Sequence, residues 1–500
     1  MLKFLGALKI KKNFQKIFYF KIKVLLLFFQ KIKIMFSSEV YKNRRKNLVK
    51  ILKSGVYLFL GNNETPMNYP SNGYHFRQDS SFLYFFGLDI AGAAAIIDIE
   101  EGKEIIFAND YDVSDIVWMG PQPKIKDLAE KCEVFETAPF SELEKYVEKV
   151  INSGRTINFL PPYKHDNMIL LNKILNISFD KMKDSASLDF IKAVIELRSK
   201  KEDIEIIEID KACIIGYLMH TASMRCMKAG IYEREIAGLM EGISLSYGGT
   251  VPSFPIIYSK NGQTLHNHYH GNLLKDGDLV LQDAGCQNEK YYASDNTRTI
   301  PVSGKFSQKQ KEIYEIVLNT INTTISLMKP GITYQEVHVK SYELICEGLI
   351  GLGLMKGDPK EAARLGATAL FMPHGLGHMM GLDVHDMEDL GQIYVGYDAY
   401  TRPSDIFGIA SLRMGRLLQT GFVVTNEPGI YFIPELIDQW KAEKKLEQFI
   451  NYDKIEKYRD FGGIRLEDDI LITENGSRIL GGDRIPITIQ EVEDFMKKES

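Results

Sequence analysis

The chain has 500 residues, more than one ordinary hydrophobic core holds, which predicts two domains. Hydrophobic residues make up 45% and charged residues 25% of the chain, as in globular proteins, and a net charge of −5 gives no general attraction to nucleic acid or anionic membranes. The five cysteines are scattered and never form a CxxC pair, which excludes a zinc ribbon and a disulfide framework and favours a reducing compartment, the cytoplasm.

Residues 1–34 differ from the rest of the chain. They carry nine lysines and no acidic residue. Their longest apolar run, residues 24–29, is too short for a membrane-spanning helix, and no small-residue cleavage pattern follows it. We interpret this segment as a poorly ordered basic leader, or as sequence upstream of a true start at Met35. A basic helix lying on a membrane surface is the alternative.

Residues 35–185 alternate short apolar strands with helical stretches, which predicts a compact α/β domain. The segments VYLFLG, AGAAAIID, KEIIFAND and RTINFLP read as strands closed by Gly, Asn, Asp or Pro. KIKDLAEKCEVF and FSELEKYVEKVINS read as helices, the second opening with Ser141 and Glu144 as a capping box. A charged stretch at 197–212 then begins a long helix.

The second predicted domain, residues 186–490, contains two well-marked helices. Ser307 with Gln310 and Thr333 with Glu336 form capping boxes at their starts. DLVLQDAG and KYYASDNTRTIPV form a predicted hairpin around a turn at 287–289, and FVVTNEPGIYFI and GGIRLEDDILIT supply two further strands. Helices over a mostly antiparallel sheet make this an α+β domain.

The hairpin places two carboxylates together. Asp283 and Asp295 lie twelve residues apart across the turn, so paired strands bring both to one face. Like charges at close range repel unless a cation neutralises them. Asp283 follows the apolar run LVL, where the strand is expected to be buried, and a buried ionised aspartate is unfavourable without a partner. The hairpin therefore indicates a metal site.

Two glutamates and one histidine extend this set. Glu467 ends GGIRL, and strand alternation turns Arg465 to the same side, where it could neutralise a ligand carboxylate. Glu427 precedes Pro428, so the strand is interrupted where the carboxylate is presented. The glycine-rich segment PHGLGHMMG carries His378 and allows close backbone approach.

Four carboxylates and one imidazole are too few for two separate sites, but they suit two hard divalent cations that share bridging carboxylates. One imidazole among oxygens favours manganese, iron, cobalt or zinc over calcium. Such a pair activates a hydroxide for hydrolysis, Glu427 can move the proton to the leaving nitrogen, and His385 or His266 can donate to the oxyanion. Amide hydrolysis is favoured over phosphoester hydrolysis because no basic cluster accompanies these motifs.

These segments, in this order, resemble the aminopeptidase P and prolidase family, the proline-specific branch of the "pita-bread" metallopeptidases. The resemblance implies two divalent ions per subunit, usually Mn²⁺ with Zn²⁺ or Co²⁺ as alternatives, and two bridging ligands, Asp295 and Glu467. It implies that His266 and His385 flank the scissile carbonyl and that His374 contacts the substrate. The implied ligand set is Asp283, Asp295, His378, Glu427 and Glu467. His268, His270 and His338 are expected to be structural.

The first domain is similar to the family's N-terminal domain in FRQDSSFLYFFG and DIVWMGP, which implies a homo-oligomer, a dimer or tetramer. The implied substrates are short peptides with proline second, without nucleic acid or stable membrane insertion. Asn296 and Asn426 stand beside ligands where apolar residues are more usual, and Asn426 could shift the orientation of Glu427.

Peptide length separates the two activities of this family. The leading hypothesis is an Xaa-Pro aminopeptidase; the alternative is a prolidase restricted to dipeptides. SLRMGRLLQTG resembles the prolidase version, in which Arg413 would hold the dipeptide carboxylate, whereas an internal salt bridge is the other interpretation of Arg413. A non-catalytic binding protein and the metal-free creatinase lack this ligand set, and a methionine aminopeptidase needs no large first domain.

Overall fold

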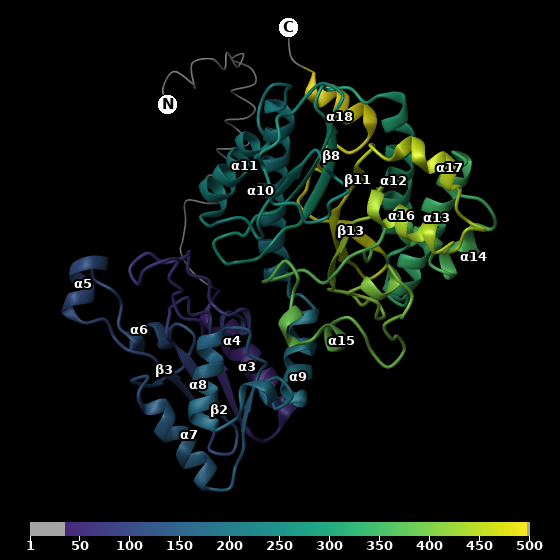
Figure 1. Ribbon diagram of the computed structural model, residues 1–500. Helices are drawn as coiled ribbons and strands as arrows, with labels where there is room; N and C mark the ends of the chain where they lie inside the picture. Colours follow the sequence, from purple (N-terminus) through teal and green to yellow (C-terminus); the bar gives the residue numbers. More distant parts are fainter. Residues whose placement is uncertain (1–35, 498–500) are drawn as a thin grey trace. The chain divides into compact units, whose positions relative to one another are not determined.

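The computed structural model describes residues 36–497 (Figure 1). The predicted basic leader, residues 1–34, lies outside the described residues. Across 36–497, no helix is both long and apolar enough to cross a membrane. The strands fall into two groups along the chain, β1–β5 and β6–β13. The predicted catalytic residues all lie in the part of the chain that holds the second group.

The first group of strands forms one five-stranded sheet in the order β4-β3-β2-β1-β5. The central pairs β1–β2 and β2–β3 are antiparallel, while β3–β4 and β1–β5 are parallel. The four strands predicted here are confirmed, and β4 is an addition. Their bounds are Val56–Leu60 (β1), Ala94–Asp98 (β2), Lys103–Phe107 (β3), Glu136–Ala138 (β4) and Ile157–Phe159 (β5).

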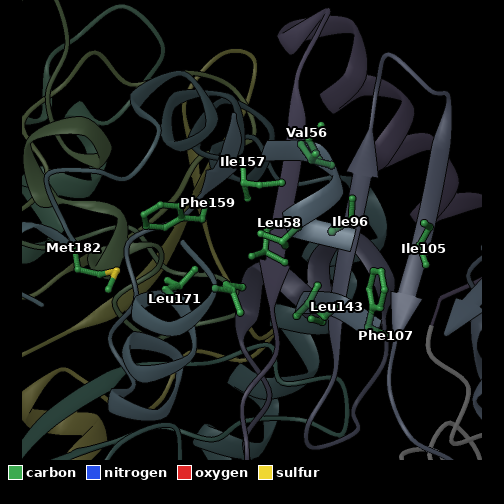
Figure 2. Close-up of a cluster of buried hydrophobic side chains, with 14 residues drawn as sticks. Val56, Leu58, Ile96, Ile105, Phe107, Leu143, Ile157, Phe159, Leu171 and Met182 are labelled. Carbon is green, nitrogen blue, oxygen red and sulfur yellow. The ribbon is translucent and has the colours of Figure 1, made fainter. Parts of the chain in front are cut away.

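Helices pack against this sheet through a buried apolar cluster (Figure 2). Leu58 and Ile96 of the central strands belong to one cluster with Leu143 of α7 and Leu171 of α8. Burying one such side chain stabilises the fold by about 1.5–3 kcal/mol. The helices of this region are α3 (Ser38–Leu52), α4 (Ser80–Phe86), α5 (Val113–Met119), α6 (Ile125–Glu130), α7 (Glu142–Asn152), α8 (His165–Leu175) and the 3₁₀ turn η1 (Phe179–Lys181).

The capping box predicted for Ser141 and Glu144 is wrong. Helix α7 does begin at Glu142, but the Ser141 hydroxyl makes no capping hydrogen bond. Ser141 already has helical backbone angles, φ −61° and ψ −19°, because the chain enters α7 through a turn in which Glu142 N–H donates to Pro139 O. A capping residue needs an extended backbone to reach the free N–H groups.

The charged stretch at 197–212 spans two helices instead of beginning one. Helix α9 (Leu188–Ser199) ends there, and α10 (Asp203–Cys226) starts after an extended Lys200. Phe190 of α9 packs edge-on against Tyr57 and Phe59 of β1, with ring centroids 5.0 and 4.9 Å apart. This helix therefore contacts the first sheet.

The second group of strands forms three small antiparallel sheets, ordered β6-β7-β8, β13-β12-β9 and β10-β11. Antiparallel sheets with packed helices match the predicted α+β class. The bounds are Ile257–Ser259 (β6), Leu279–Ala284 (β7), Asn296–Pro301 (β8), Val423–Asn426 (β9), Gly429–Tyr431 (β10), Gly463–Arg465 (β11), Asp468–Ile472 (β12) and Ser477–Ile479 (β13).

Long helices cover these sheets: α10 contacts β7 and β8, and α12 contacts β9, β10 and β11. The predicted capping boxes at Ser307 and Thr333 are both confirmed. The remaining helices are α11 (Glu233–Gly248), α12 (Gln308–Leu327), α13 (Tyr334–Gly351), α14 (Pro359–Arg364), α15 (Gln392–Val395), α16 (Pro434–Ala442), α17 (Tyr452–Ile455) and α18 (Ile489–Met496). Four 3₁₀ turns complete the set, η2 (Ala367–Leu370), η3 (Glu388–Leu390), η4 (Ile409–Ser411) and η5 (Glu456–Tyr458).

Candidate active site

One cavity of about 570 Å³ brings together every predicted site residue. Its lining comes from segments far apart in the sequence: the β7–β8 hairpin, the glycine-rich loop before β9, and the breaks between later strands. The predicted residues that line it are Asp283, Asp295, His378, Glu427, Glu467, His266, His374, His385, Arg413 and Arg465. His268, expected to be structural, is exposed and also lines this cavity.

The hairpin is antiparallel and places both aspartates on one face. Asp283 pairs with Thr297, and Ala284 pairs with Asn296. Asp295, directly before β8, lies two residues from Thr297 and is therefore diagonally across from Asp283. The turn is later than predicted, because Gln287 and Ala293 still form a bridge and Tyr291 takes the left-handed conformation with φ 66°.

Each glutamate stands where a strand is broken. Glu427 separates β9 from β10, as predicted from Pro428, and its N–H donates to Leu376 O at 2.9 Å. Glu467 separates β11 from β12, so the segment predicted as one strand is two. The Glu467 N–H donates to Thr297 O at 3.0 Å, and the Thr297 hydroxyl donates to Glu467 Oε2 at 2.6 Å. The backbone of each glutamate is thus fixed by a neighbouring segment, and the Glu467 carboxylate is also held by Thr297.

The three consecutive acids at 467–469 are all buried, and they alternate as predicted. Asp469 Oδ2 accepts from Asp295 N–H at 2.9 Å, on the cavity side. Asp468 faces the other way and pairs with Arg298 and Arg484, both at 2.7 Å. Only Glu467 of the three lines the cavity.

His378 presents a lone pair to the carboxylates. Its Nδ1 lies 3.0 Å from Met379 O, which can only accept, so Nδ1 carries the proton. Its Nε2 lies 3.4 Å from Asp295 Oδ2 and 3.8 Å from Glu427 Oε1. Asp295, His378 and Glu467 each direct one donor atom to a common point, with these atoms within 4.8 Å of one another. Asp283 and Glu427 line the same cavity outside that tight group.

The electrostatics of these carboxylates call for positive charge. Burial raises the pKa of Asp295 well above its usual value, and the charge of Glu467 raises it further. Burial and the charge of Glu427 do the same to the pKa of Glu467. Asp283 Oδ1 is buried and has no hydrogen-bond partner among the described residues. An orphaned carboxylate oxygen, crowded carboxylates and a neutral imidazole form a donor set that fits divalent cations.

Arg465 supplies one fixed positive charge at this site. Its Nη2 donates to Asp283 Oδ2 at 2.6 Å, and its Nε donates to the Thr297 hydroxyl at 3.2 Å. Its Nη1 donates to Tyr431 Oη at 2.9 Å. Arg465 and Arg413 together bring two positive charges to a cavity with four carboxylates, so the remaining negative charge favours cation binding.

Tyr431 is a site residue that the sequence analysis did not find. Its hydroxyl lies 2.9 Å from His374 Nε2, while His374 Nδ1 donates to Gly375 O at 2.8 Å. Burial lowers the pKa of His374 to about 3, so the ring is neutral and accepts from the tyrosine. A chain of donors therefore runs from Arg465 through Tyr431 to His374. The one feature of the sequence that could have indicated Tyr431 is its position four residues after Glu427.

His385 and Arg413 lie together beside His378. The rings of His385 and His378 are 4.3 Å apart at their centroids, and Arg413 Nη1 lies 2.7 Å from His385 Nε2. Glu388, a second residue that the sequence analysis did not find, accepts from His385 Nδ1 at 2.6 Å. Asn426, expected to affect Glu427, instead bonds to Thr324 and to Ile321 O behind the strand.

Comparison with known proteins identifies two family models and several relatives that match this chain. The model of metallopeptidase family M24 matches residues 208–474, and that of the aminopeptidase P N-terminal domain matches residues 41–158. The chain is 32% identical to Xaa-Pro dipeptidase from Rattus norvegicus, covering 84% of each chain. It is 31% identical to Xaa-Pro aminopeptidase from Escherichia coli, covering 89% of this chain and 94% of that one.

Among solved structures, the fold is similar to aminopeptidase P from E. coli with the inhibitor Pro-Leu. The TM-score is 0.76 at 30% identity, with 93% of this chain and 99% of that chain covered. Proline aminopeptidase P II from Yersinia pestis gives the same TM-score at 28% identity, with 92% and 99% covered.

Proposed function

Because the chain belongs to metallopeptidase family M24 and carries an aminopeptidase P N-terminal domain, we propose that it hydrolyses the Xaa-Pro bond and releases the N-terminal residue of short peptides. The observation that carries this proposal is the convergence of all predicted site residues in one cavity. Relatives named for this bond, both aminopeptidases and dipeptidases, support the same choice of substrate.

Two divalent ions would be held by Asp283, Asp295, His378, Glu427 and Glu467, with Mn²⁺ as the expected metal and Zn²⁺ or Co²⁺ as alternatives. When bound, such ions activate water and polarise the substrate carbonyl. Support comes from the shared direction of Asp295, His378 and Glu467 and from the unpartnered Asp283 oxygen.

The remaining roles follow from where each side chain lies. Glu427 lines the cavity, so its carboxylate is positioned to take a proton and pass it to the leaving nitrogen. His266 lines the cavity and is positioned to donate to the carbonyl oxygen. His385 lines it too, but its Nδ1 donates to Glu388 and its Nε2 faces Arg413 Nη1, so it would donate to the carbonyl only after Arg413 moves away. His374 has both ring nitrogens engaged, so it holds Tyr431 and the pocket wall in place. Arg465 orients Asp283.

The leading hypothesis is an Xaa-Pro aminopeptidase, and the second candidate is an Xaa-Pro dipeptidase. Arg413 lines the cavity, which favours a clamp for a dipeptide carboxylate. Arg413 also contacts His385 and lies 3.8 Å from Glu388, which favours an internal role. We lead with the aminopeptidase because a guanidinium already engaged is less available to a substrate carboxylate.

Two organisational features belong to the same proposal. We place the domain boundary near residue 185, between η1 and α9. We expect a homo-oligomer, supported by α5, on which Val113, Val117 and Trp118 are 78, 73 and 84% exposed. Size-exclusion chromatography with light scattering measures that state, and a monomer at micromolar concentration would contradict it.

The test of the function compares Ala-Pro-Ala, Ala-Pro and Ala-Ala-Ala with the Mn²⁺-loaded protein. Release of alanine from Ala-Pro-Ala and not from Ala-Ala-Ala supports the Xaa-Pro aminopeptidase, and cleavage of Ala-Pro alone selects the dipeptidase. Fewer than one bound divalent ion per chain after Mn²⁺ loading, with no hydrolysis, would refute the enzyme.

A further inference from the structure

Glu388 contacts two residues that line the candidate catalytic cavity, His385 and Arg413. Its Oε2 accepts from His385 Nδ1 at 2.6 Å, and its Oε1 lies 3.8 Å from Arg413 Nε. Arg413 Nη1 in turn lies 2.7 Å from His385 Nε2. The imidazole is thus enclosed between a carboxylate and a guanidinium.

The backbone brings Glu388 to this position through a tight turn. Met387 is fully buried and takes the left-handed conformation with φ 65°, which is uncommon for a residue with a Cβ. The turn closes with Glu388 N–H donating to His385 O at 3.2 Å. A buried side chain in an unfavourable backbone conformation shows that the surrounding packing fixes this turn.

Glu388 carries its charge at neutral pH. The hydrogen bond from His385 is the largest influence and lowers the pKa of Glu388, and the Arg413 charge lowers it further. A negative charge is therefore present beside Arg413, the group proposed to attract a substrate carboxylate.

Glu388 also stands at the border between two cavities. The catalytic cavity is lined by Arg413, and a second cavity of about 450 Å³ is lined by Glu388. Val384 and His385 line both. A peptide whose proline lay at Arg413 would continue over this border into the second cavity, whereas a dipeptide would end there with its carboxylate.

We propose that Glu388 selects substrates by length: its carboxylate, 3.8 Å from Arg413 Nε, competes for this guanidinium and disfavours a free carboxylate directly after proline, so that peptides longer than two residues are preferred. This inference rests on the proposed Xaa-Pro hydrolysis at the neighbouring site. A dipeptide carboxylate must compete with Glu388 for the guanidinium. An amide or a further residue at the same place carries no such charge and meets no such competition.

The test uses the full-length Mn²⁺-loaded protein with Glu388→Gln and the substrates Ala-Pro, Ala-Pro-amide and Ala-Pro-Ala. Glutamine retains the shape and an oxygen that accepts from His385 but removes the charge. We expect kcat/KM for Ala-Pro, relative to Ala-Pro-amide, to rise by about two- to fivefold, the range of a partly exposed charge pair. The rise should come from a lower KM for Ala-Pro.

Asp389→Asn is the matched control, with both variants assayed at pH 8. Burial raises the pKa of Asp389 to about 7, so at pH 8 this substitution removes a negative charge from the same turn. The hydrogen bonds of His385 and Arg413 in the described chain do not involve Asp389. The substrate ratio of Asp389→Asn should stay at the wild-type value. If Glu388 only supports His385, Glu388→Gln lowers kcat for all three substrates and leaves the ratio unchanged, which overturns the proposal. An equal rise in the control overturns it too.

The proposed function can fail separately. If the wild-type protein cleaves none of the three substrates, the Xaa-Pro activity is wrong. Isothermal titration calorimetry then measures the Kd of Ala-Pro and of Ala-Pro-amide, and the ratio of these two Kd values takes the place of the kcat/KM ratio. A ratio unmoved by Glu388→Gln in that measurement refutes the selection by charge.

Discussion

The loop that carries His385 is fixed by a buried ionic cluster, and Asp386 is its centre. Asp386 accepts from Arg198 Nη2 at 2.7 Å and from Lys201 Nζ at 2.9 Å, and the side chains of all three residues are at most 3% exposed. Asp386→Asn retains the shape but leaves the buried Lys201 without its paired carboxylate, and leaves the buried Arg198 with only the partly exposed Asp383. Breaking a buried pair in this way destabilises a protein by about 3–5 kcal/mol.

Urea unfolding at pH 7, followed by tryptophan fluorescence and circular dichroism, measures this loss. Asp383→Asn is the control, since Asp383 lies in the same loop and contacts Arg198 at 3.2 Å but is 37% exposed. Partly exposed pairs contribute about 0–1 kcal/mol. The reasoning is refuted if Asp386→Asn lowers the free energy of unfolding by no more than the control does.

The same cluster fixes a pH dependence. Burial alone would raise the pKa of Asp386, but the charges of Lys201 and Arg198 outweigh it and hold this pKa below its ordinary value. A carboxyl with a lowered folded-state pKa stabilises the fold above its unfolded-state pKa, and this contribution is lost as the pH falls through the folded-state value. The free energy of unfolding of the wild-type protein should therefore decrease as the pH is lowered below about 4. In Asp386→Asn, the share of this decrease that comes from protonation of Asp386 should be absent.

Three further outcomes follow from the catalytic cavity. Thr297→Val removes the hydrogen bond to Glu467 and should weaken Mn²⁺ binding about 10- to 100-fold in calorimetry; unchanged affinity would contradict it. Tyr431→Phe breaks the link between Arg465 and His374 and should lower kcat about tenfold with Mn²⁺ content unchanged; loss of metal instead would place Tyr431 among the ligand supports. Chelation of the metal should lower Tm, and by more at pH 8 than at pH 5. Burial raises the pKa of Glu427 to about 7, so the metal-free fold is stabilised by a bound proton at pH 5 and loses this stabilisation as the pH rises to 8. A decrease in Tm that does not depend on pH would contradict the crowding of these carboxylates.

The metal-capable residues could be predicted because each leaves a local signal. Asp283 follows a buried run of aliphatic residues, and Glu427 precedes a proline that ends a strand. A charge where the strand pattern demands an apolar residue needs compensation, whatever the fold. Such conflicts between pattern and chemistry can be found without coordinates.

The residues that were missed act through contacts that no local pattern encodes. Tyr431 meets His374 across 57 positions and Arg465 across 34. Glu388 looks like an ordinary surface acid until a left-handed turn at Met387 folds it back on His385. The capping box predicted at Ser141 was wrong for the converse reason. The spacing of Ser141 and Glu144 fits a capping box, but the preceding turn gives Ser141 helical backbone angles instead of the extended ones that a cap requires.

The first part of the chain supports the catalytic loop directly. Arg77 donates to Leu382 O at 2.7 Å, and the Ser80 hydroxyl donates to Asp383 Oδ1 at 2.7 Å. Both donors belong to the FRQDSS segment, and Asp383 lies two residues before His385. A group that donates to a reacting carbonyl must be held to within about 0.5 Å, which a loop achieves only with rigid partners. The segment that carried the family resemblance in the first domain therefore fixes the loop that holds His385, and under the proposed function it would act on catalysis through the position of that histidine.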